Sequence, residues 1–325
     1  PPVITIFFFI YCLKSLSNEF KLYYKFKIYI YKIMNSQISK NSHISIYVPA
    51  FNAESTIRSC LNSIIAQTVK PQEILIINDA STDSTQEILL EYGDKIKIIK
   101  NPKNLGISHS MNIANNHLKT KFIGKIDADV ELSPNWIELL MDKMSDDKIT
   151  LVGGKMYEKF IQNPYNLWRS KRLKQNWGED NLSNPKFIFG CNNILNNSKL
   201  GNIKKYRTDS DYFKTNGEDI EFSNFLIKNN HKLYYCSKAI CYHLQNDTGF
   251  SLASRYWRYI YYGDGMKKKN FFKTIKNILR QFKKTFKWTL LDIFKVNFKL
   301  IPVNIIIFFY FTILELKFYK KNKIK

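Results

Sequence analysis

The segment ISIYVPAFNAESTIRSCLNSIIAQTVKPQEILIINDASTDST, residues 44–85, predicts the architecture of this chain. Two short apolar runs, 44–50 and 73–79, enclose a segment whose apolar residues recur at helical spacing from Ile57 to Leu61 and beyond. Short apolar runs between polar turns are typical of buried strands, and a spacing of three to four is typical of a helix. The segment therefore predicts a strand–helix–strand unit with parallel strands.

The same alternation continues beyond this unit. We expect a helix in 81–92, a strand in 96–101, a helix in 107–118 and a strand in 121–129. This order predicts an α/β fold with a mainly parallel mixed sheet flanked by helices. Ligands of such sheets bind beyond the carboxyl ends of the strands, so the polar residues at strand ends should gather on one edge. These residues are Asn52, Asp79, Asn101, Asp127 and Asp129.

The segment after residue 149 has a less regular pattern. Strand-like pieces are expected in 149–157 and 187–193, and a helix is expected from about Asp219 to Lys228. A pair of strands that ends at His243 is expected to follow that helix.

The charge of the chain is concentrated at its ends. Of the formal net charge of +23, the residues from Met266 onward carry +14 and residues 1–40 carry +5. The middle, 41–265, carries the remaining +4. Basic ends on a nearly neutral body favour attachment to an anionic membrane surface over a body that grips a nucleic-acid backbone.

The five cysteines form no recognisable pattern. None is spaced as C-x-x-C and their number is odd, so neither a disulfide framework nor a zinc site is expected. A reducing compartment fits this composition, and together with the basic ends it predicts a peripheral protein at the cytoplasmic face of a membrane.

Three regions are expected along the chain. They are an apolar and basic N-terminal extension (1–40), an α/β domain (41–248) and a helical, basic, membrane-associating C-terminal region (249–325). The first methionine is Met34, and residues 1–33 are interpreted as an upstream extension ahead of the natural start. A signal peptide is the alternative, but no basic segment precedes the apolar part and no small-residue cleavage site follows it.

The C-terminal region combines apolar and basic residues in a helical pattern. In 271–294 the lysines and the arginine lie largely apart from one apolar face, which consists of Phe271, Ile275, Ile278, Leu279, Phe282 and Phe286. This pattern is typical of a helix that lies in a membrane interface, and a solvated basic face is the alternative. The apolar run 301–314 is short for a span, so a surface-lying segment and a crossing both stay open.

Two aspartates follow the fourth expected strand, in KIDADVELSP (125–134). Carboxylate oxygens are the ligands that Mg²⁺ and Mn²⁺ prefer. Alternate strand residues face opposite ways, so Asp127 and Asp129 reach one ion only if the strand ends or bends there, as Pro134 indicates. We therefore predict a Mg²⁺ or Mn²⁺ site at Asp129 and Asp127, with ribose as the alternative partner of Asp127.

Two other strand ends carry candidate binding residues. Phe51 is a candidate for stacking on a base, and Asn52 or Glu54 is a candidate for contacting a nucleotide. The alternatives are that Phe51 is a core residue and that Asn52 caps the following helix. Asp79 is a candidate acceptor of hydrogen bonds from a base or ribose. His243 is a candidate third metal ligand or a structural histidine at a strand end.

Later segments carry candidates for catalysis and acceptor binding. Glu218 and Asp219 begin an expected helix, where acids either cap the helix or supply a general base for an acceptor hydroxyl. In FGCNN (189–193), Gly190 and Asn192 suit a loop that binds the acceptor sugar, and Glu218 is placed on the same side.

The combined motifs resemble the catalytic domain of glycosyltransferase family 2, of GT-A fold, over roughly 43–245. The resemblance is carried by residues 44–85 together with NPKNLGISHSMNIA, KIDADVELSPNWIELL and GEDIEFSNFLIKNNHKLYYCSKAICYH. It implies an inverting transferase whose donor is a nucleotide-diphosphate sugar held by Mg²⁺ or Mn²⁺. It also implies that Asp219 is the catalytic base, that Asp129 and in some members His243 hold the metal, and that the nucleotide sugar is bound by Pro49, Phe51, Asn52, Glu54, Asp79, Lys103, Gly106 and Asp127.

The sequence departs from the family in one respect that concerns the product. The Q-x-x-R-W signature of processive synthases is missing, and RYWRY (255–259) is only an echo of it. We therefore expect the transfer of one sugar to a surface glycan or lipid-linked saccharide. The alternatives are a basic nucleic-acid-binding protein and a catalytically inactive relative, and the joint presence of Asp127, Asp129 and Asp219 argues against the latter.

Overall fold

The computed structural model describes residues 43–200, 206, 217–263 and 270–323. The predictions made for 1–40 lie outside these residues. From His43 onward the chain forms one compact unit, which includes the C-terminal helices.

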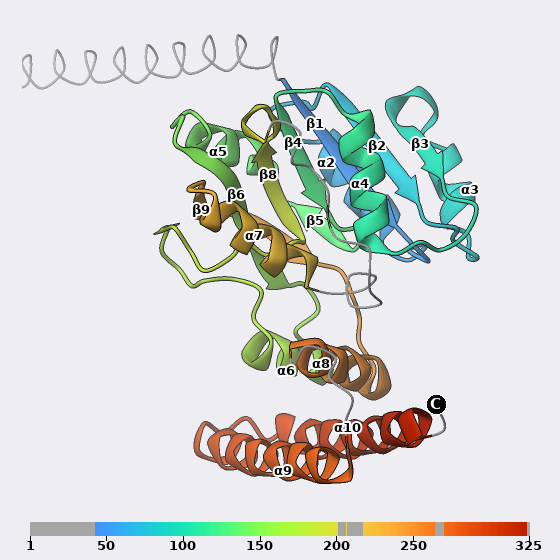
Figure 1. The fold of residues 1–325 in the computed structure, drawn as a ribbon, viewed down its shortest axis with the longest axis vertical. Helices are drawn as coiled ribbons and strands as arrows, with labels where there is room; N and C mark the ends of the chain where they lie inside the picture. The colour runs from blue at the N-terminus through green and yellow to red at the C-terminus, as the bar shows by residue number, and fades with distance from the viewer. Residues whose placement is uncertain (1–42, 201–205, 207–216, 264–269, 324–325) are drawn as a thin grey trace, which may run out of the picture. The chain divides into compact units, whose positions relative to one another are not determined.

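The first half of the sheet is parallel, as the alternating pattern predicts. Its strands lie in the order β3-β2-β1-β4 (Figure 1). They are β1 (Ile44–Ala50), β2 (Glu73–Asn78), β3 (Lys97–Lys100) and β4 (Phe122–Ile126). The helices between them are α2 (Ile57–Ile65), α3 (Thr85–Leu90) and α4 (Ile107–His117). All seven elements fall within the expected ranges.

The second half makes the sheet mixed. The order continues from β4 through β8-β6-β9-β5, with β8 antiparallel to both of its neighbours and β6 parallel to β9. Its strands are β5 (Val130–Leu132), β6 (Ile149–Glu158), β8 (Asn192–Asn196) and β9 (Lys232–His243), and β7 (Leu182–Ser183) pairs with β9. The helices here are α5 (Trp136–Lys143), α6 (Pro164–Arg172) and α7 (Glu218–Lys228).

Two details of this half differ from the sequence-based expectation. The strand pair expected to end at His243 is wrong, because β9 is one strand of 12 residues. It stays continuous by shifting register against β6 between Gly154 and Lys155. The strand expected in 187–193 begins only at Asn192.

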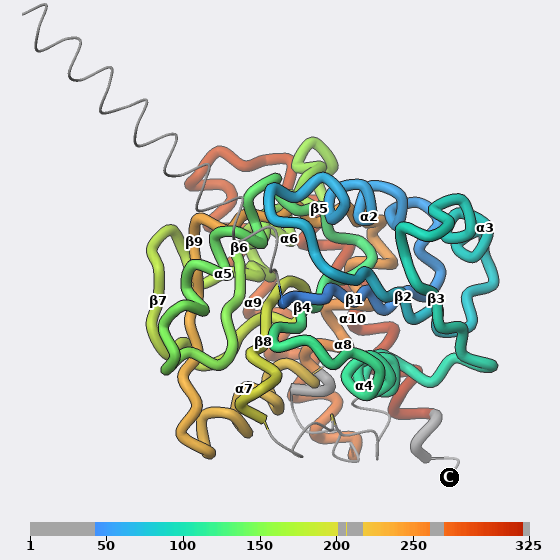
Figure 2. Tube along the Cα trace, turned by 90° about the horizontal axis from the view of Figure 1, so that it is seen from above, coloured from blue at the N-terminus to red at the C-terminus, as the bar shows by residue number. Residues whose placement is uncertain are grey.

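Both faces of the sheet are covered by helices, so alternate residues of its central strands enter different cores. In β1, Ile46 and Val48 pack with α2 and α5, whereas Tyr47 packs with α4. Figure 2 shows α2 and α3 on one side of the sheet, and α4 and α7 on the other. This arrangement leaves the carboxyl ends of the parallel strands as an open edge for polar side chains.

The acidic segment lies in a turn at that edge. Strand β4 ends at Ile126, and β5 begins at Val130. Between them the chain turns, and the N–H of Val130 donates to the carbonyl of Asp127 at 3.0 Å. The predicted end of the strand at Asp127 is therefore confirmed.

The C-terminal region forms a layer of helices beside this edge. It contains α8 (Gly249–Gly263), α9 (Phe271–Phe294) and α10 (Leu300–Lys323), and Figure 1 shows α9 and α10 side by side. Trp168 of α6 is fully buried among α8 and α10, against Leu252, Val303 and Phe311. Helix α10 is long and apolar enough, from Leu300 to Lys320, to cross a bilayer by length and composition, although one side of it is buried in this layer.

Helix α9 buries its polar side and exposes its apolar side. The buried positions are Thr274, Asn277, Gln281, Thr285 and Asp292. They bond to neighbouring helices: Asn277 donates to Glu315 at 2.8 Å, and Gln281 accepts from Tyr256 at 2.9 Å. Phe271, Leu279, Phe282 and Phe286 are each more than half exposed. This arrangement is the reverse of a helix that packs on a water-soluble core.

Candidate functional site

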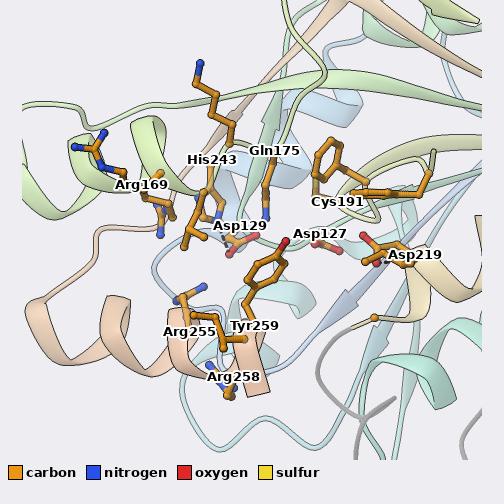
Figure 3. A pocket seen from close by; sticks show the side chains of 18 of the residues that line it. Asp127, Asp129, Arg169, Gln175, Cys191, Asp219, His243, Arg255, Arg258 and Tyr259 are labelled. Carbon is orange, nitrogen blue, oxygen red and sulfur yellow. Dashed lines mark hydrogen bonds and ion pairs between the residues drawn. The ribbon is translucent and has the colours of Figure 1, made fainter. Parts of the chain in front are cut away.

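A pocket of about 660 Å³ lies between the acidic turn and the C-terminal helices (Figure 3). The carboxylates of Asp127, Asp129 and Asp219 line it, together with His243. The structure thus brings the predicted metal residues and the predicted base into one cavity. Its other wall consists of side chains from α6, α8 and α9.

Asp127 is held by a buried lysine of β4, the strand that precedes it. Lys125 Nζ lies 2.9 Å from Asp127 Oδ1 and donates to the carbonyl of Gly190 at 2.6 Å. Burial acts to lower the pKa of Lys125, but the charges of Asp127 and Glu218 outweigh it and raise that pKa above its usual value. Burial raises the pKa of the Asp127 carboxyl, against the opposing charge of Lys125.

Asp129 is paired with His243 instead. His243 Nε2 lies 3.2 Å from Asp129 Oδ2, and Nδ1 lies 3.0 Å from Glu158 Oε2. Burial alone would lower the pKa of His243, but Asp129 and Glu158 raise it to about 9. The charge and hydrogen bond of His243 likewise outweigh burial and hold the pKa of Asp129 well below its usual range.

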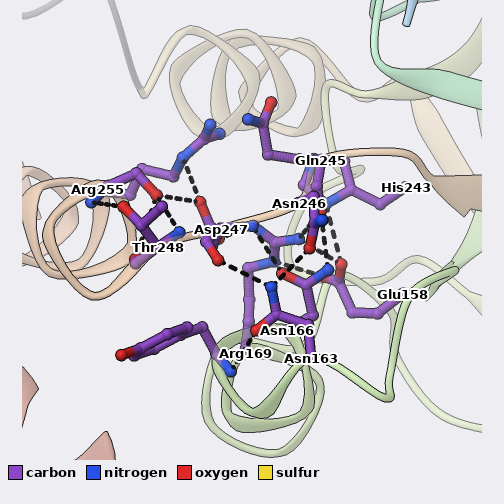
Figure 4. A network of polar contacts seen from close by, with 12 residues as sticks. Glu158, Asn163, Asn166, Arg169, His243, Gln245, Asn246, Asp247, Thr248 and Arg255 are labelled. Carbon is purple, nitrogen blue, oxygen red and sulfur yellow. Dashed lines mark hydrogen bonds and ion pairs between the residues drawn. The ribbon is translucent and has the colours of Figure 1, made fainter. Parts of the chain in front are cut away.

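The pairing continues from His243 as a chain of alternating charges (Figure 4). Glu158 accepts two hydrogen bonds from Arg169, at 2.8 and 2.5 Å. Arg169 also pairs with Asp247, whose Oδ1 lies 3.4 Å from Arg255 Nε. Arg169 follows Trp168 on α6, so one short helix connects the acidic turn to the C-terminal helical layer.

Asp219 lies at the start of α7, held by two backbone N–H groups. The N–H of Gly190 donates to Oδ2 at 3.0 Å, and that of Ile220 donates to Oδ1 at 2.8 Å. Burial raises the pKa of Asp219, and these hydrogen bonds oppose the rise. Its neighbour Glu218 is buried beside Lys125, and burial together with the charge of Asp219 raises the pKa of Glu218 to about 7.

The predicted nucleotide-side residues lie on the loops that follow β1 and β2. Asn52 Oδ1 accepts from the N–H of Thr82 at 2.8 Å, and Glu54 accepts from the N–H of Ser84 at 2.9 Å. Both side chains therefore tie the first loop to the second. Pro49 lies within β1, and Phe51 is 48% exposed, so the core alternative for Phe51 does not hold.

Asp79 organises the third loop. Its carboxylate accepts from Asn101 Nδ2 at 2.7 Å and from the N–H groups of Leu105 and Gly106 at 2.9 and 2.8 Å. Gly106 has a φ of 89°, a backbone conformation that favours glycine. Lys103 of the same loop is exposed. The expected gathering of polar strand ends is confirmed for Asp79 and Asn101.

The predicted acceptor-side residues Gly190, Asn192 and Glu218 make their contacts within the protein. The side chain of Asn192 is fully buried and accepts from Trp136 Nε1 at 3.2 Å, so it faces the core. Gly190 contributes through its backbone, which bonds Lys125 and Asp219. Glu218, as described, lies beside Lys125.

The acidic turn fits a divalent cation in its chemistry, although the described residues hold no cluster of three or more His, Cys, Asp and Glu ready to bind one. Asp127 Oδ1 is buried and lacks a well-aligned hydrogen-bond donor, despite its ion pair with Lys125. Carboxylate oxygens are hard ligands, and Mg²⁺ sites commonly combine one or two of them with water and phosphate oxygens. Asp127 and Asp129 are therefore the residues suited to hold the ion.

This sheet, with an acidic turn at its edge and a carboxylate at the facing helix start, is that of a GT-A sugar-transferring enzyme. The chain belongs to glycosyltransferase family 2: the model of the family described as "Glycosyl transferase family 2" matches residues 45–214, more than half of the chain. The fold also resembles that of a mannosyltransferase from Pyrobaculum calidifontis solved with GDP-Man and Mn²⁺. That likeness has a TM-score of 0.53 at 16% identity, and it covers 66% of this chain and 60% of that one.

Two curated relatives match the chain over little more than a third of its length. A hyaluronan synthase of Pasteurella multocida is 37% identical over 127 residues, which are 37% of this chain and 13% of that protein. An uncharacterized glycosyltransferase of Haemophilus influenzae is 40% identical over 115 residues, 34% of this chain and 36% of that protein. The chain thus aligns with only a minor part of the length of these relatives.

Several residues of the site were not anticipated from the sequence. Lys125 interrupts the apolar run FIGKI, and a charge within a buried strand is a signal that it has a partner. Glu158, Arg169 and Asp247 carry no comparable signal. Arg169 pairs with residues 11 and 78 positions away, and local spacing does not encode such contacts.

Proposed function

We propose that this chain is a metal-dependent, inverting glycosyltransferase that transfers one sugar at a time. Its donor is a nucleotide-diphosphate sugar, and its acceptor is a hydroxyl of a surface glycan or lipid-linked saccharide at the cytoplasmic face of a membrane. The observation that carries the proposal is the shared pocket of Asp127, Asp129 and Asp219, because it unites diphosphate-holding and proton-accepting groups.

The residues of the pocket divide the work between donor and acceptor. Asp127 and Asp129 would hold a Mg²⁺ or Mn²⁺ ion, which when bound stabilises the negative charge of the leaving diphosphate. Lys125 keeps Asp127 in position. Asp219 would take the proton of the acceptor hydroxyl as that oxygen attacks the sugar, and its raised pKa makes it a stronger base than an exposed aspartate.

The loops at the strand ends are proposed to bind the nucleotide. The half-exposed ring of Phe51 is available for stacking on the base, and Asp79 holds the 101–106 loop in place. Asn52, Glu54, Lys103 and Gly106 complete these loops, and Pro49 lies in β1 just before the first of them. The GDP-Man and the Mn²⁺ bound to the Pyrobaculum enzyme support this class of donor.

Replacement of the proposed base tests the function directly. The full chain is first assayed against a panel of nucleotide sugars, with and without Mn²⁺, for hydrolysis or transfer. Asp219→Asn should then lower turnover by about 10²–10⁴-fold, the usual contribution of general-base catalysis, while nucleotide affinity survives. Asp94→Asn, an exposed acid in another part of the molecule, is the matched control. An equal loss of nucleotide binding in Asp219→Asn would contradict the assignment.

The exposed apolar face of α9 supports attachment to a membrane. Leu279 and Phe286 lie two turns apart on this face and are 56% and 59% exposed. Lys283 and Lys287 are exposed beside them, as in helices that lie in an interface with anionic lipids. The polar side of α9 is already occupied by α8 and α10, which leaves the apolar side for the bilayer.

Vesicle binding tests this attachment. Leu279→Glu with Phe286→Glu should weaken flotation with phosphatidylcholine–phosphatidylglycerol vesicles by more than about tenfold, since burial of one such side chain contributes about 1.5–3 kcal/mol. Leu90→Glu, an equally exposed leucine on α3, is the control. Undiminished flotation of the double variant would refute the role of α9. Point variants are preferable to truncation, because removing α10 would expose the core around Trp168.

A further inference from the structure

We propose that the helical wall of the pocket is a binding subsite for a phosphate-bearing acceptor. This wall, which we call the basic wall, consists of Arg172, Lys174, Arg255, Arg258, Arg280 and Lys284. The inference rests on the proposed function, because it assigns a chemical class to the acceptor of that reaction.

The two signs of charge are separated across the pocket. The carboxylates of Asp127, Asp129 and Asp219 lie at the edge of the sheet, and the cations come from α6, α8, α9 and the segment after α6. Figure 3 shows Arg255 and Arg258 below the level of these acids, on the helix α8.

Carboxylates behind the basic wall position two of its members. Asp292 lies 2.8 Å from Arg172, and Asp247 lies 3.4 Å from Arg255. Both acids are almost fully buried and neither lines the pocket. They orient these guanidinium groups in advance, and a planar guanidinium in a fixed position is well suited to phosphate oxygens.

The cations of helix α9 lie on two different sides of the helix, one that faces the pocket and one that does not. Arg280 and Lys284 lie one turn apart and line the pocket, whereas Lys283 and Lys287 lie one turn apart and do not. The apolar face with Leu279 forms a third side. One helix therefore offers cations to the pocket and an apolar surface to a membrane, which suits an acceptor that is anionic near the reacting sugar.

The acceptor is favoured over the donor because of the two cations on α9. The diphosphate of the donor is proposed at Asp127 and Asp129, where Lys125 and Arg255 act on the carboxylates. Arg280 and Lys284 come from the helix whose apolar face is proposed to lie on the membrane, so a group that they bind would belong to an acceptor on that side of the pocket. A phosphate there has two possible sources, a lipid-phosphate carrier and a phosphorylated soluble saccharide, which share the same recognition chemistry.

Direct binding measurements on the full chain test the proposal, with hexyl phosphate, hexyl β-glucoside and inorganic phosphate as probes. Wild-type protein should bind hexyl phosphate more tightly than the uncharged glucoside. Arg280→Gln with Lys284→Gln should weaken hexyl phosphate binding by about tenfold or more, as expected for the loss of charge-assisted hydrogen bonds. Lys283→Gln with Lys287→Gln, which removes the same charge from α9, should change it less than about twofold.

The outcomes distinguish the two sources of the phosphate, and they distinguish failure of this proposal from failure of the proposed function. Hexyl phosphate that binds more tightly than inorganic phosphate supports a lipid-linked acceptor, and equal binding supports a soluble one. The proposal is overturned if both double variants weaken hexyl phosphate equally, if the glucoside binds as well, or if affinity for the nucleotide diphosphate with Mn²⁺ falls in parallel in the pocket variant. Failure of the proposed function is a different result, namely no turnover of any nucleotide sugar by the wild-type chain.

Discussion

Replacement of Arg169 by methionine should destabilise the protein more than the loss of any exposed ion pair. Arg169 is 4% exposed and neutralises Glu158 and Asp247, which are themselves buried. The Arg169→Met variant keeps the bulk of the side chain but removes the cation that Glu158 and Asp247 share, which leaves Glu158 with His243 and Asp247 with Arg255 at 3.4 Å. Breaking a buried pair in this way costs about 3–5 kcal/mol. For a unit of this size, that corresponds to a fall in Tm of about 5–8 °C.

Thermal unfolding of the metal-free protein, followed by circular dichroism, measures this effect. Arg58→Met is the matched control, because Arg58 makes a similar two-point pair with Glu91 at the surface, with both side chains at least half exposed. Its Tm should change by less than about 3 °C. Adding Asp247→Asn to Arg169→Met should recover part of the loss, since it removes a buried carboxylate whose remaining cation, Arg255, lies 3.4 Å away. Equal shifts in the two arginine variants, or no recovery in the double variant, would refute the reasoning.

Three further predictions concern the acidic turn, the base and the sheet. Asp129→Ala should abolish Mn²⁺-dependent binding of nucleotide diphosphates in calorimetry, and Asp142→Ala, an exposed acid on α5, should retain it. Because the pKa of Glu218 is about 7 when folded, against 4.5 as its ordinary value, the folded state holds an extra proton between these pH values and loses stability as pH rises through them. This loss of stability is at most about 3 kcal/mol, and Glu218→Gln should not show it when unfolding by urea is measured with EDTA present. If the stability of the two proteins depended on pH in the same way, the raised pKa of Glu218 would be excluded. Gly154→Ala should lower the free energy of unfolding by about 1–3 kcal/mol, because the new Cβ would lie 2.5 Å from the carbonyl oxygen of Ala239. A change below about 0.5 kcal/mol would show that the backbone of β6 shifts to accommodate the methyl group.

The first half of the fold and the position of the acidic turn were predictable from local patterns. In 44–126, β1 pairs with β2 and β2 pairs with β3, each the next strand along the chain, and β4 returns to pair with β1. Short apolar runs with helical repeats between them leave few such arrangements open. The end of β4 at Ile126 follows from the same reasoning, since Asp127 and Asp129 would otherwise place a charge in a buried strand.

In the C-terminal region, the helical pattern predicts the helix but not which of its sides packs against the protein. The periodicity of 271–294 predicts a helix and separates its apolar residues from its basic ones, and α9 has both features. It does not state which side faces the protein. That side is polar, because Asn277 and Gln281 find partners on α10 and α8, and only the assembled layer supplies those partners.

The second half and the buried charge network depended on contacts between distant segments. The pattern of β9 was compatible with two strands, and its pairing with β6 makes it one. Asn192 was expected at the acceptor, but its neighbour in space is Trp136, 56 residues earlier. The chain from Asp129 through His243, Glu158 and Arg169 joins residues up to 114 positions apart. Local spacing reports which segments form strands and helices, whereas burial and charge pairing over such separations exist only once those segments pack together.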